Sequence, residues 1–476
     1  MNPCRGIFWS ALAIALFATL GPCATSAGAV AQPNVLLIVS DDQGWPDLGC
    51  IGQKAIRTPH LDRLAAEGVR ATHFYVTWPA CTPSRGSILT GRFPQRNGLY
   101  DMVRNDLVNY GHVFSAEDYA VSPEMTLGLD PREKTLGDLL RGAGYRTGAV
   151  GKWDMGQAKR YLPLQRGFDF FYGHGNNGID YYTHERYGVP SLFSGNARTS
   201  ADKGVYATDL FKRESLRFIN AAPPGRPWFL YLCFNAPHGA SSFTGETKAD
   251  GKKLGAGVQA PEEFVAPYRA QGLTEPLARY LGAVTCMDAA IGDLIAQIKA
   301  RGEERDTLVI FLSDNGGSGN GGNAPLRGQK STMWEGGLSV PFIARWPAQL
   351  PVGRVTGEFL TTLEIFPMLA TAAGARAPAG VALDGFDMTP VLRGEKPSAR
   401  TEMFWQRRGD FAARVGNWKL SKTGGAGGLF DLAADRAEKI DRSKEHPEIV
   451  ARLKARLEQW RAEMEASEPR GPFRDY

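Results

Sequence analysis

Short, continuous apolar segments of the chain stop abruptly at polar residues. The segments are Asn34–Ser40 before Asp41-Asp42, Thr307–Ser313 before Asp314-Asn315, Trp228–Phe234 before Asn235 and His238, and the weaker Tyr145–Val150 before Gly151-Lys152. A short apolar run rich in β-branched residues is typical of a strand that is buried on both faces, which is the environment of a parallel sheet. The pattern therefore predicts four parallel strands, each with polar residues at its carboxyl end.

Segments with apolar residues at helical spacing lie between these runs, at Leu61–Val69, Thr135–Ala143 and Leu277–Ala300. Alternating strands and helices predict an α/β fold in which helices cover both faces of a mostly parallel sheet. Ligands of such sheets bind beyond the carboxyl ends of the strands. If the four strands are neighbours, their polar residues converge there.

After Gly394 the pattern changes to short, alternating strands followed by a helix from about Pro447 to Ala466. This predicts a smaller C-terminal antiparallel sheet with a terminal helix. We expect a catalytic domain over residues 32–394 and a C-terminal subdomain over residues 395–476.

The first 31 residues have the pattern of a signal peptide. Arg5 precedes an apolar run over residues 7–20, which is too short for a bilayer span of about 20 residues. We expect cleavage after Ala31 and export to the periplasm or the extracellular space; the alternative is an uncleaved anchor. We expect no later membrane span, and therefore no membrane association after signal cleavage.

Composition narrows the class of protein. Of 476 residues, 43% are hydrophobic and 22% charged, which excludes a mostly disordered chain. The 56 glycines and 30 prolines exclude a coiled coil. The 55 basic and 50 acidic residues give a net charge of only +5, so the charge gives no sign of a nucleic-acid partner.

The predicted strand ends offer three carboxylates and an amide, namely Asp41, Asp42, Asp314 and Asn315. These hard oxygen donors suit Ca²⁺ or Mg²⁺ rather than zinc, and a set of several protein ligands favours Ca²⁺. The alternative is that each acidic pair merely caps the next turn or helix.

Residues 81–92 read CTPSRGSILTGR. By its residues alone, Cys81 is a candidate nucleophile at a helix start, with Arg85 lowering its pKa and binding an anion. A buried, inert thiol is the alternative.

The same segment matches C-x-P-S-R-x-x-x-L-T-G-R at every fixed position, which is the sulfatase signature. The segments NVLLIVSDDQGWPDLGCIG, TPHLDRLAAEG, GKWDMG, NAPH, SDNGG and RGQKSTMWEGGLSVPFIARWP follow in that family's order. Over residues 33–460 the chain resembles the type I, formylglycine-dependent sulfatases, which are arylsulfatase-like members of the alkaline phosphatase superfamily. The resemblance implies a large mixed sheet sandwiched by helices.

The resemblance also implies roles for individual residues. Cys81 is converted to formylglycine by a formylglycine-generating or sulfatase-maturating enzyme, and residue 81 contacts Ca²⁺ together with Asp41, Asp42, Asp314 and Asn315. Arg85 stabilises the hydrated aldehyde, Lys152 and Lys330 bind sulfate oxygens, and His238 protonates the leaving alcohol. The implied substrate is a sulfate monoester, of a sulfated saccharide or another small molecule. A phosphonate or phosphodiester hydrolase and a non-catalytic binder of sulfated polymers remain as alternatives.

One position departs from the family pattern, because Asp154 stands where GKWHxG has histidine. Either the carboxylate serves as the base that deprotonates the sulfated intermediate, or His112, His174 or His184 fills the gap. His60 and His73 are expected to be structural. Long polar and aromatic segments over residues 95–130 and 172–206 are expected to face the substrate, with candidate contacts at Arg104, Asn105, Tyr181, Tyr182, Glu185 and Arg186.

Overall fold

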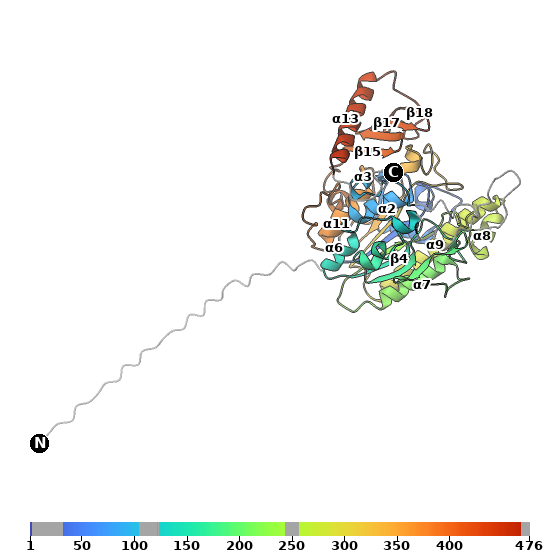
Figure 1. Ribbon diagram of the computed structural model, residues 1–476, viewed down its shortest axis with the longest axis vertical. Helices are drawn as coiled ribbons and strands as arrows, with labels where there is room; N and C mark the ends of the chain where they lie inside the picture. Colours follow the sequence, from blue (N-terminus) through green and yellow to red (C-terminus); the bar gives the residue numbers. More distant parts are fainter. Residues whose placement is uncertain (2–31, 104–120, 122, 243–256, 468–476) are drawn as a thin grey trace. The chain divides into compact units, whose positions relative to one another are not determined.

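The four predicted strands lie side by side in a ten-stranded sheet with the order β13-β2-β12-β11-β1-β10-β4-β5-β8-β9. The chain is seen here in a computed structural model that describes Met1 and residues 32–103, 121, 123–242 and 257–467 (Figure 1). The strands are β1 (Asn34–Ser40), β2 (Val69–Ala71), β4 (Arg146–Lys152), β5 (Phe170–His174), β8 (Leu192–Ser194), β9 (Ala197–Arg198), β10 (Trp228–Cys233), β11 (Thr307–Ser313), β12 (Phe342–Arg345) and β13 (Arg354–Thr356).

The centre of the sheet is parallel and its margins are mixed. Strand β1 pairs in parallel with β10 and β11, and β4 pairs in parallel with β10 and β5. At the margins, β12 runs antiparallel to β11 and β2, and β8 runs antiparallel to β5 and β9. The last pair on the β2 side, β13 with β2, is parallel. The expected large mixed, mostly parallel sheet is therefore confirmed.

The predicted strand boundaries hold for β1 and β11, whereas β4 extends two residues further, to Lys152. This extension depends on Gly151, whose φ is +93° and whose position leaves no room for a side chain. A Cβ there would lie 1.9 Å from the carbonyl oxygen of Cys233 on the adjacent strand. Glycine thus allows the strands to stay paired up to the residue that carries the ammonium group.

Alternate residues of β1 face two separate cores. Val35, Leu37 and Val39 pack among residues of α2 (Cys81–Thr90), α6 (Leu136–Gly142) and α11 (Ile365–Ala372). Leu36 and Ile38 pack on the opposite face, among residues of α1 (Pro59–Ala66), α7 (Ala207–Asn220) and α9 (Glu275–Ala300). The period of two residues along a strand places helices on both faces, as the continuous apolar runs predict.

Shorter elements complete the described part of the chain. They are α3 (Pro94–Asn97), α5 (Pro123–Thr126), α8 (Glu262–Arg269), α10 (Glu335–Leu338), α12 (Thr389–Arg393), the pair β3 (Phe74–Tyr75) and β14 (Leu360–Thr361), and the pair β6 (Glu185–Arg186) and β7 (Val189–Pro190).

Helix α9 is long and apolar enough to cross a membrane by length and composition, so the expectation of no later segment of this kind was wrong. However, 67% of its most apolar window is buried inside the protein. Its side chains belong to the core formed with α1 and α7. In the fold, α9 is a core helix of the α/β sandwich.

A second, four-stranded antiparallel sheet follows, as predicted. It consists of β15 (Glu402–Arg407), β16 (Asp410–Val415), β17 (Trp418–Thr423) and β18 (Ala426–Asp431), and α13 (Pro447–Ala466) packs on it (Figure 1). Its core also includes Tyr75, Phe93 and Met333 from the preceding part of the chain. The boundary at residues 394 and 395 stays a prediction.

Candidate active site

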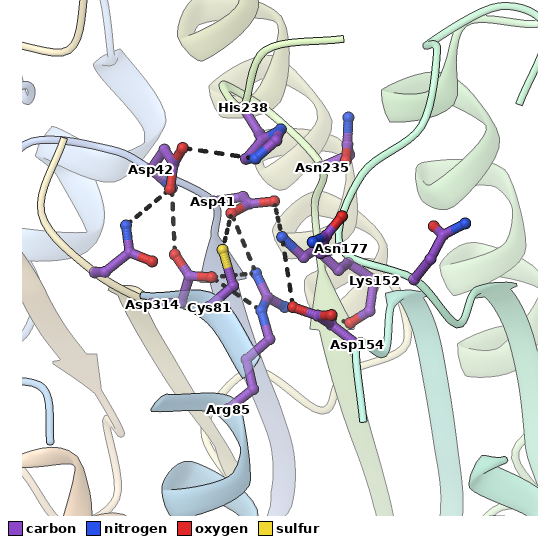
Figure 2. Close-up of polar contacts among 12 residues, drawn as sticks. Asp41, Asp42, Cys81, Arg85, Lys152, Asp154, Asn177, Asn235, His238 and Asp314 are labelled. Carbon is purple, nitrogen blue, oxygen red and sulfur yellow. Dashed lines mark hydrogen bonds and ion pairs between the residues drawn. The ribbon is translucent and has the colours of Figure 1, made fainter. Parts of the chain in front are cut away.

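The polar residues at the four predicted strand ends meet in one place, because β11, β1, β10 and β4 are consecutive strands of the sheet and all run in the same direction. Asp41 and Asp42 follow β1, Asp314 follows β11, and Lys152 ends β4 (Figure 2). The side chain of each of these four residues is at least 96% buried. The sheet thus gathers three carboxyls and an ammonium group from distant parts of the sequence.

Helix α2 brings Cys81 and Arg85 to the same place. Cys81 is its first residue and Arg85 lies one turn further, so both side chains are on one face of the helix. The Arg85 guanidinium lies 2.7 Å from the Asp314 carboxylate, and the Cys81 Sγ lies 3.4 Å from Asp41 Oδ1. Both side chains are fully buried.

Two lysines complete an alternation of positive and negative groups. Lys152 Nζ lies 2.6 Å from Asp41 Oδ2, and Lys330 Nζ lies 2.6 Å from Asp42 Oδ1 and 3.2 Å from Cys81 Sγ. Burial by itself would raise the pKa of Asp42, but the charges of Lys330, His238 and Lys152 together outweigh burial and hold that pKa well below its usual range. Asp42 is therefore ionised at neutral pH.

The donor set fits a hard divalent cation. Ligand atoms of Asp41, Asp42, Cys81 and His238 all lie within 4.8 Å of one another. Asn315 donates from Nδ2 to Asp42 Oδ1 at 2.8 Å, which orients its amide, while its buried Oδ1 has no hydrogen-bond partner among the described residues. Carboxylate and amide oxygens are the ligands that Ca²⁺ takes. The orphaned oxygen of Asn315 is an acceptor that such an ion would satisfy.

An unmodified Cys81 is a poor nucleophile in this setting. Burial, followed by the negative charges of Asp314 and Asp41, raises the pKa of its thiol well above the ordinary value. The expectation that Arg85 lowers this pKa is wrong, because the guanidinium pairs with Asp314 instead. The site therefore holds a protonated thiol where a thiolate would be needed for attack.

His238 is held in one tautomer. Its Nδ1 lies 2.6 Å from the carbonyl oxygen of Gly239, so Nδ1 carries the hydrogen and Nε2 faces Asp42 Oδ2 at 3.7 Å. Burial is the main cause that lowers the pKa of His238 to about 3. The Tyr181 hydroxyl lies 2.8 Å from the main-chain oxygen of His238, so Tyr181 is a buried support for this segment, rather than the sugar contact that the sequence suggested.

Asp154 lies in the site, 3.9 Å from Lys152 Nζ and 1% exposed. Burial raises the pKa of its carboxyl to about 6. Its φ of +57° is unusual for a residue other than glycine and turns the chain directly after β4. A carboxyl group with this pKa changes protonation state near neutral pH, as a proton-transferring group must.

The alternative histidines differ in position. His174 ends β5 and pairs with Lys152 across the sheet; its Nδ1 contacts Asn176 and its buried Nε2 has no partner among the described residues. His184 instead contacts the carbonyl oxygen of Val205 at 2.9 Å. His112, like Arg104 and Asn105, lies outside the described residues.

Two asparagines were not assigned to the site from the sequence. Figure 2 shows Asn177 next to Lys152, and Asn235 on the side of the site where His238 lies. The Asn235 amide is buried and has no hydrogen-bond partner among the described residues, whereas Asn177 accepts a hydrogen bond from Arg186. Asn177 follows β5, a fifth parallel strand whose short sequence, FFYGH, lacks the long apolar run of the others. Asn177 could have been predicted from the sequence by the rule that site residues follow the carboxyl ends of parallel strands.

The comparisons with known proteins agree with this geometry. Residues 33–375 match the family model described as Sulfatase. The chain is 32% identical to N-acetylgalactosamine-6-sulfatase from Canis lupus familiaris over 86% of this chain and 75% of that protein, and 33% identical to arylsulfatase A from Homo sapiens over 86% and 78%. The crystal structure of Ps i-CgsB in complex with k-i-k-neocarrahexaose superposes with a TM-score of 0.78 at 30% identity, covering 90% of this chain and 92% of that one.

The family model matches most of the chain, and the strand ends of the fold bring buried acidic, basic and cysteine side chains together. Both observations assign the chain to the same family. The chain belongs to the sulfatase family of the alkaline phosphatase superfamily, and it is a sulfuric ester hydrolase of the arylsulfatase type.

Proposed function

We propose that this chain is an exported, Ca²⁺-dependent sulfatase that removes sulfate from a sulfated saccharide, with a formylglycine made from Cys81 by a maturating enzyme. The position of residue 81 carries the proposal. Its Sγ lies 3.2 Å from the Lys330 ammonium and 3.4 Å from the Asp41 carboxylate, between a group that attracts sulfate and a group that attracts a cation. The high pKa of the thiol also favours a converted side chain.

Asp41, Asp42, Asp314 and Asn315, with residue 81, would hold the metal ion, which when bound polarises a sulfate oxygen. The ionisable side chains of the site support a divalent ion. The site holds three cationic side chains and four acidic ones, which leave one negative charge: Arg85, Lys152 and Lys330 against Asp41, Asp42, Asp154 and Asp314. A divalent cation would change this to one positive charge. That balance suits the single negative charge of a sulfate monoester.

The chain's own residues provide the remaining chemistry. Lys152, Lys330 and Arg85 stand around residue 81 and can bind the sulfate oxygens as charge develops on them. After water adds to the aldehyde of the converted residue 81, one hydroxyl of the hydrate can attack sulfur, forming an O–S bond while the bond from sulfur to the alcohol oxygen breaks. His238 must gain a proton on Nε2 before it can protonate the leaving alcohol, and the Asp154 carboxylate can accept a proton on the opposite side.

Two observations support a sulfated saccharide as the substrate: the names of similar proteins, and a buried amide group in the site. One relative is named N-acetylgalactosamine-6-sulfatase, and Ps i-CgsB was crystallised with k-i-k-neocarrahexaose. In this chain the Asn235 amide offers a donor and an acceptor that have no protein partner among the described residues. Amide groups of this kind suit sugar hydroxyls. Export is supported by the apolar leader over residues 7–20.

The first test is the mass of the tryptic peptide Ala71–Arg85, from protein made in its native host. Conversion gives a peptide lighter by the change from CH₂SH to CHO. The converted protein should release sulfate from sulfated saccharides, Cys81→Ala should abolish this, and the matched Cys50→Ala variant should keep it.

Three results would contradict the proposal. Sulfate release by Cys81→Ala at the original rate would exclude residue 81 as the nucleophile. Faster turnover of phosphate diesters or phosphonates than of sulfate esters at equal concentration would favour the phosphonate or phosphodiester hydrolase. A fully unconverted thiol in active protein would also reject the formylglycine.

A further inference from the structure

We propose that the C-terminal four-stranded sheet is part of the sulfate-binding machinery, because it positions Lys330 through the segment that carries it, residues 327–337 (the Lys330 loop). Lys419 on β17 is the main positioning residue. This inference rests on the proposed role of Lys330 in binding sulfate. It assigns to the second sheet a task in the reaction, although the structure shows none of its side chains contacting residue 81.

The Lys330 loop has little regular structure of its own. It ends within α10, and its backbone is hydrogen-bonded to segments next to the site: Lys330 N–H donates to the Gly317 oxygen at 3.0 Å, Ser331 N–H donates to the Pro79 oxygen at 2.7 Å, and the Gly337 oxygen accepts from Gly316 N–H at 3.1 Å. Ser331 has a φ of +70°, an uncommon value for serine. Local sequence does not favour this backbone, so contacts from outside the loop must hold it.

One face of β17 supplies such contacts. Lys419, Ser421 and Thr423 alternate along the strand and therefore point to the same side. The Thr423 hydroxyl accepts the Met333 N–H at 2.9 Å, three residues from Lys330. Lys419 Nζ lies 2.9 Å from Glu335 Oε1, and Arg407 at the end of β15 donates to the Ser331 carbonyl oxygen at 3.4 Å.

Lys419 is the centre of a fully buried ion cluster. Its ammonium contacts Glu335 and, at 3.0 Å, Glu438, and all three side chains are excluded from solvent. Glu438 Oε2 accepts the N–H of Glu335 at 2.6 Å, and the Tyr75 hydroxyl donates to Glu335 Oε2 at 2.7 Å. Burial raises the pKa of Glu335, but the charges of Lys419, Arg436 and Arg414 together outweigh burial and lower that pKa to about 2. Only one arrangement of these side chains gives every buried charge its partner, and this arrangement fixes the end of the loop relative to both sheets.

The geometry of Lys330 explains why such fixing matters. Its ammonium has to meet Asp42 at 2.6 Å and residue 81 at 3.2 Å at the same time. A displacement of the loop by about 1 Å would disturb both contacts, and misplacement of that size can cost about 100-fold in rate. Lys152, by contrast, is held by strand β4 and needs no help from the second sheet.

The test compares Lys419→Met, Lys419→Arg and Thr423→Val with Lys422→Met, all in the full chain. Lys422 is the matched control, because it is exposed and lies on the opposite face of the same strand. Hydrogen exchange of the peptide that covers residues 327–337 reports on the loop without requiring turnover. Kinetics with a sulfate ester, and inhibition by inorganic sulfate, report on sulfate binding.

We expect Lys419→Met to speed exchange in the Lys330 loop more than elsewhere and to lower kcat/KM by at least about tenfold, mainly through KM, with weaker inhibition by sulfate. Lys419→Arg should restore most of both, and Lys422→Met should change neither. If Lys419→Met does not fold, Thr423→Val decides, with an expected loss of about fivefold, the value of one hydrogen bond.

Unchanged loop exchange in the folded Lys419→Met variant, or in Thr423→Val when Lys419→Met does not fold, would overturn the inference. So would a looser loop with unchanged KM and sulfate inhibition, or an equal effect of Lys422→Met. Failure of the proposed function is a separate result: a wild-type protein with no sulfate-ester turnover would reject the function, while the exchange data would still show whether Lys419 holds the loop.

Discussion

The strand-end groups and the Lys330 loop place charged side chains in the same site by different means. Asp41, Lys152 and Asp314 follow or end parallel strands whose pairing leaves them no freedom to move apart. Lys330 belongs to a loop whose position depends on contacts with β17 and β15, about 90 residues later in the sequence. A catalytic group can thus be set by the register of a sheet or by a distant support, and the two should respond differently to substitution.

Breaking the strand-end set should have the largest effect. Asp314→Asn removes a charge that would bind the metal ion and removes the closer of the two ion pairs of the buried Arg85. We expect kcat/KM to fall by about 10³-fold or more, with a parallel loss of Ca²⁺ affinity in calorimetric titration. Asp306→Asn is the matched control, because Asp306 is exposed at the opposite end of β11. Normal Ca²⁺ affinity in Asp314→Asn would remove Asp314 from the ligand set.

Substitutions at Lys152 and Lys330 test whether a lysine held by a strand and a lysine held by a loop differ in rigidity. Lys152→Ala and Lys330→Ala should each lower kcat/KM by about 100-fold, because each removes a charge beside the sulfate. Arginine should restore more activity at residue 330 than at residue 152, since a loop can shift to accept the larger group, whereas a strand buried between two neighbours cannot. Equal rescue, measured as kcat/KM, would show that both lysines are held equally rigidly.

Asp154 should set a pH dependence that neither lysine produces. Its pKa of about 6 means that the carboxylate form increases as the pH rises through 6, so kcat/KM should rise over that range if the carboxylate acts as a base. Asp154→Asn should lower activity by about 10–100-fold and remove this acid limb. An unchanged limb in a weakened variant would transfer the role to another group, and His174→Gln would then be the variant to measure.

The smallest effect concerns stability at the junction of the two sheets. Burial, followed by the charges of Arg436 and Arg414, lowers the pKa of His73 to about 4 from 6.5. Between these values the unfolded chain binds a proton that the folded chain does not, so stability falls as the pH drops from 6.5 to 4, by up to about 1.4 kcal/mol per pH unit. His73→Gln should flatten this slope in denaturant titrations, whereas the exposed His446→Gln should not. An equal slope in His73→Gln would assign it to other groups.

The sequence was most informative where chemistry and periodicity coincide. The apolar runs before Asp41 and Asp314 predict strands with the observed boundaries, and the rule for parallel sheets brings their ends together. Other features depend on pairings that no local pattern contains. The raised pKa of the Cys81 thiol results from its burial and from the charges of Asp314 and Asp41, which are distant in sequence. Tyr181 supports His238 from a segment without periodicity. The support of Lys330 by Lys419 joins residues that are distant in sequence and whose types alone do not indicate a pair.

The hairpin between β16 and β17 is joined by only Gly416 and Asn417, with Gly416 at a φ of +58°. The side on which a strand residue points is set by whether its position is odd or even. Inserting or deleting a single residue in this turn, with the rest of β17 sliding along its partner, would turn Lys419 and Thr423 away from the Lys330 loop and turn Leu420 and Lys422 towards it. Length variation among related chains should therefore be rare at this turn and commoner in changes of two residues, since only an even change keeps the ammonium group beneath the loop.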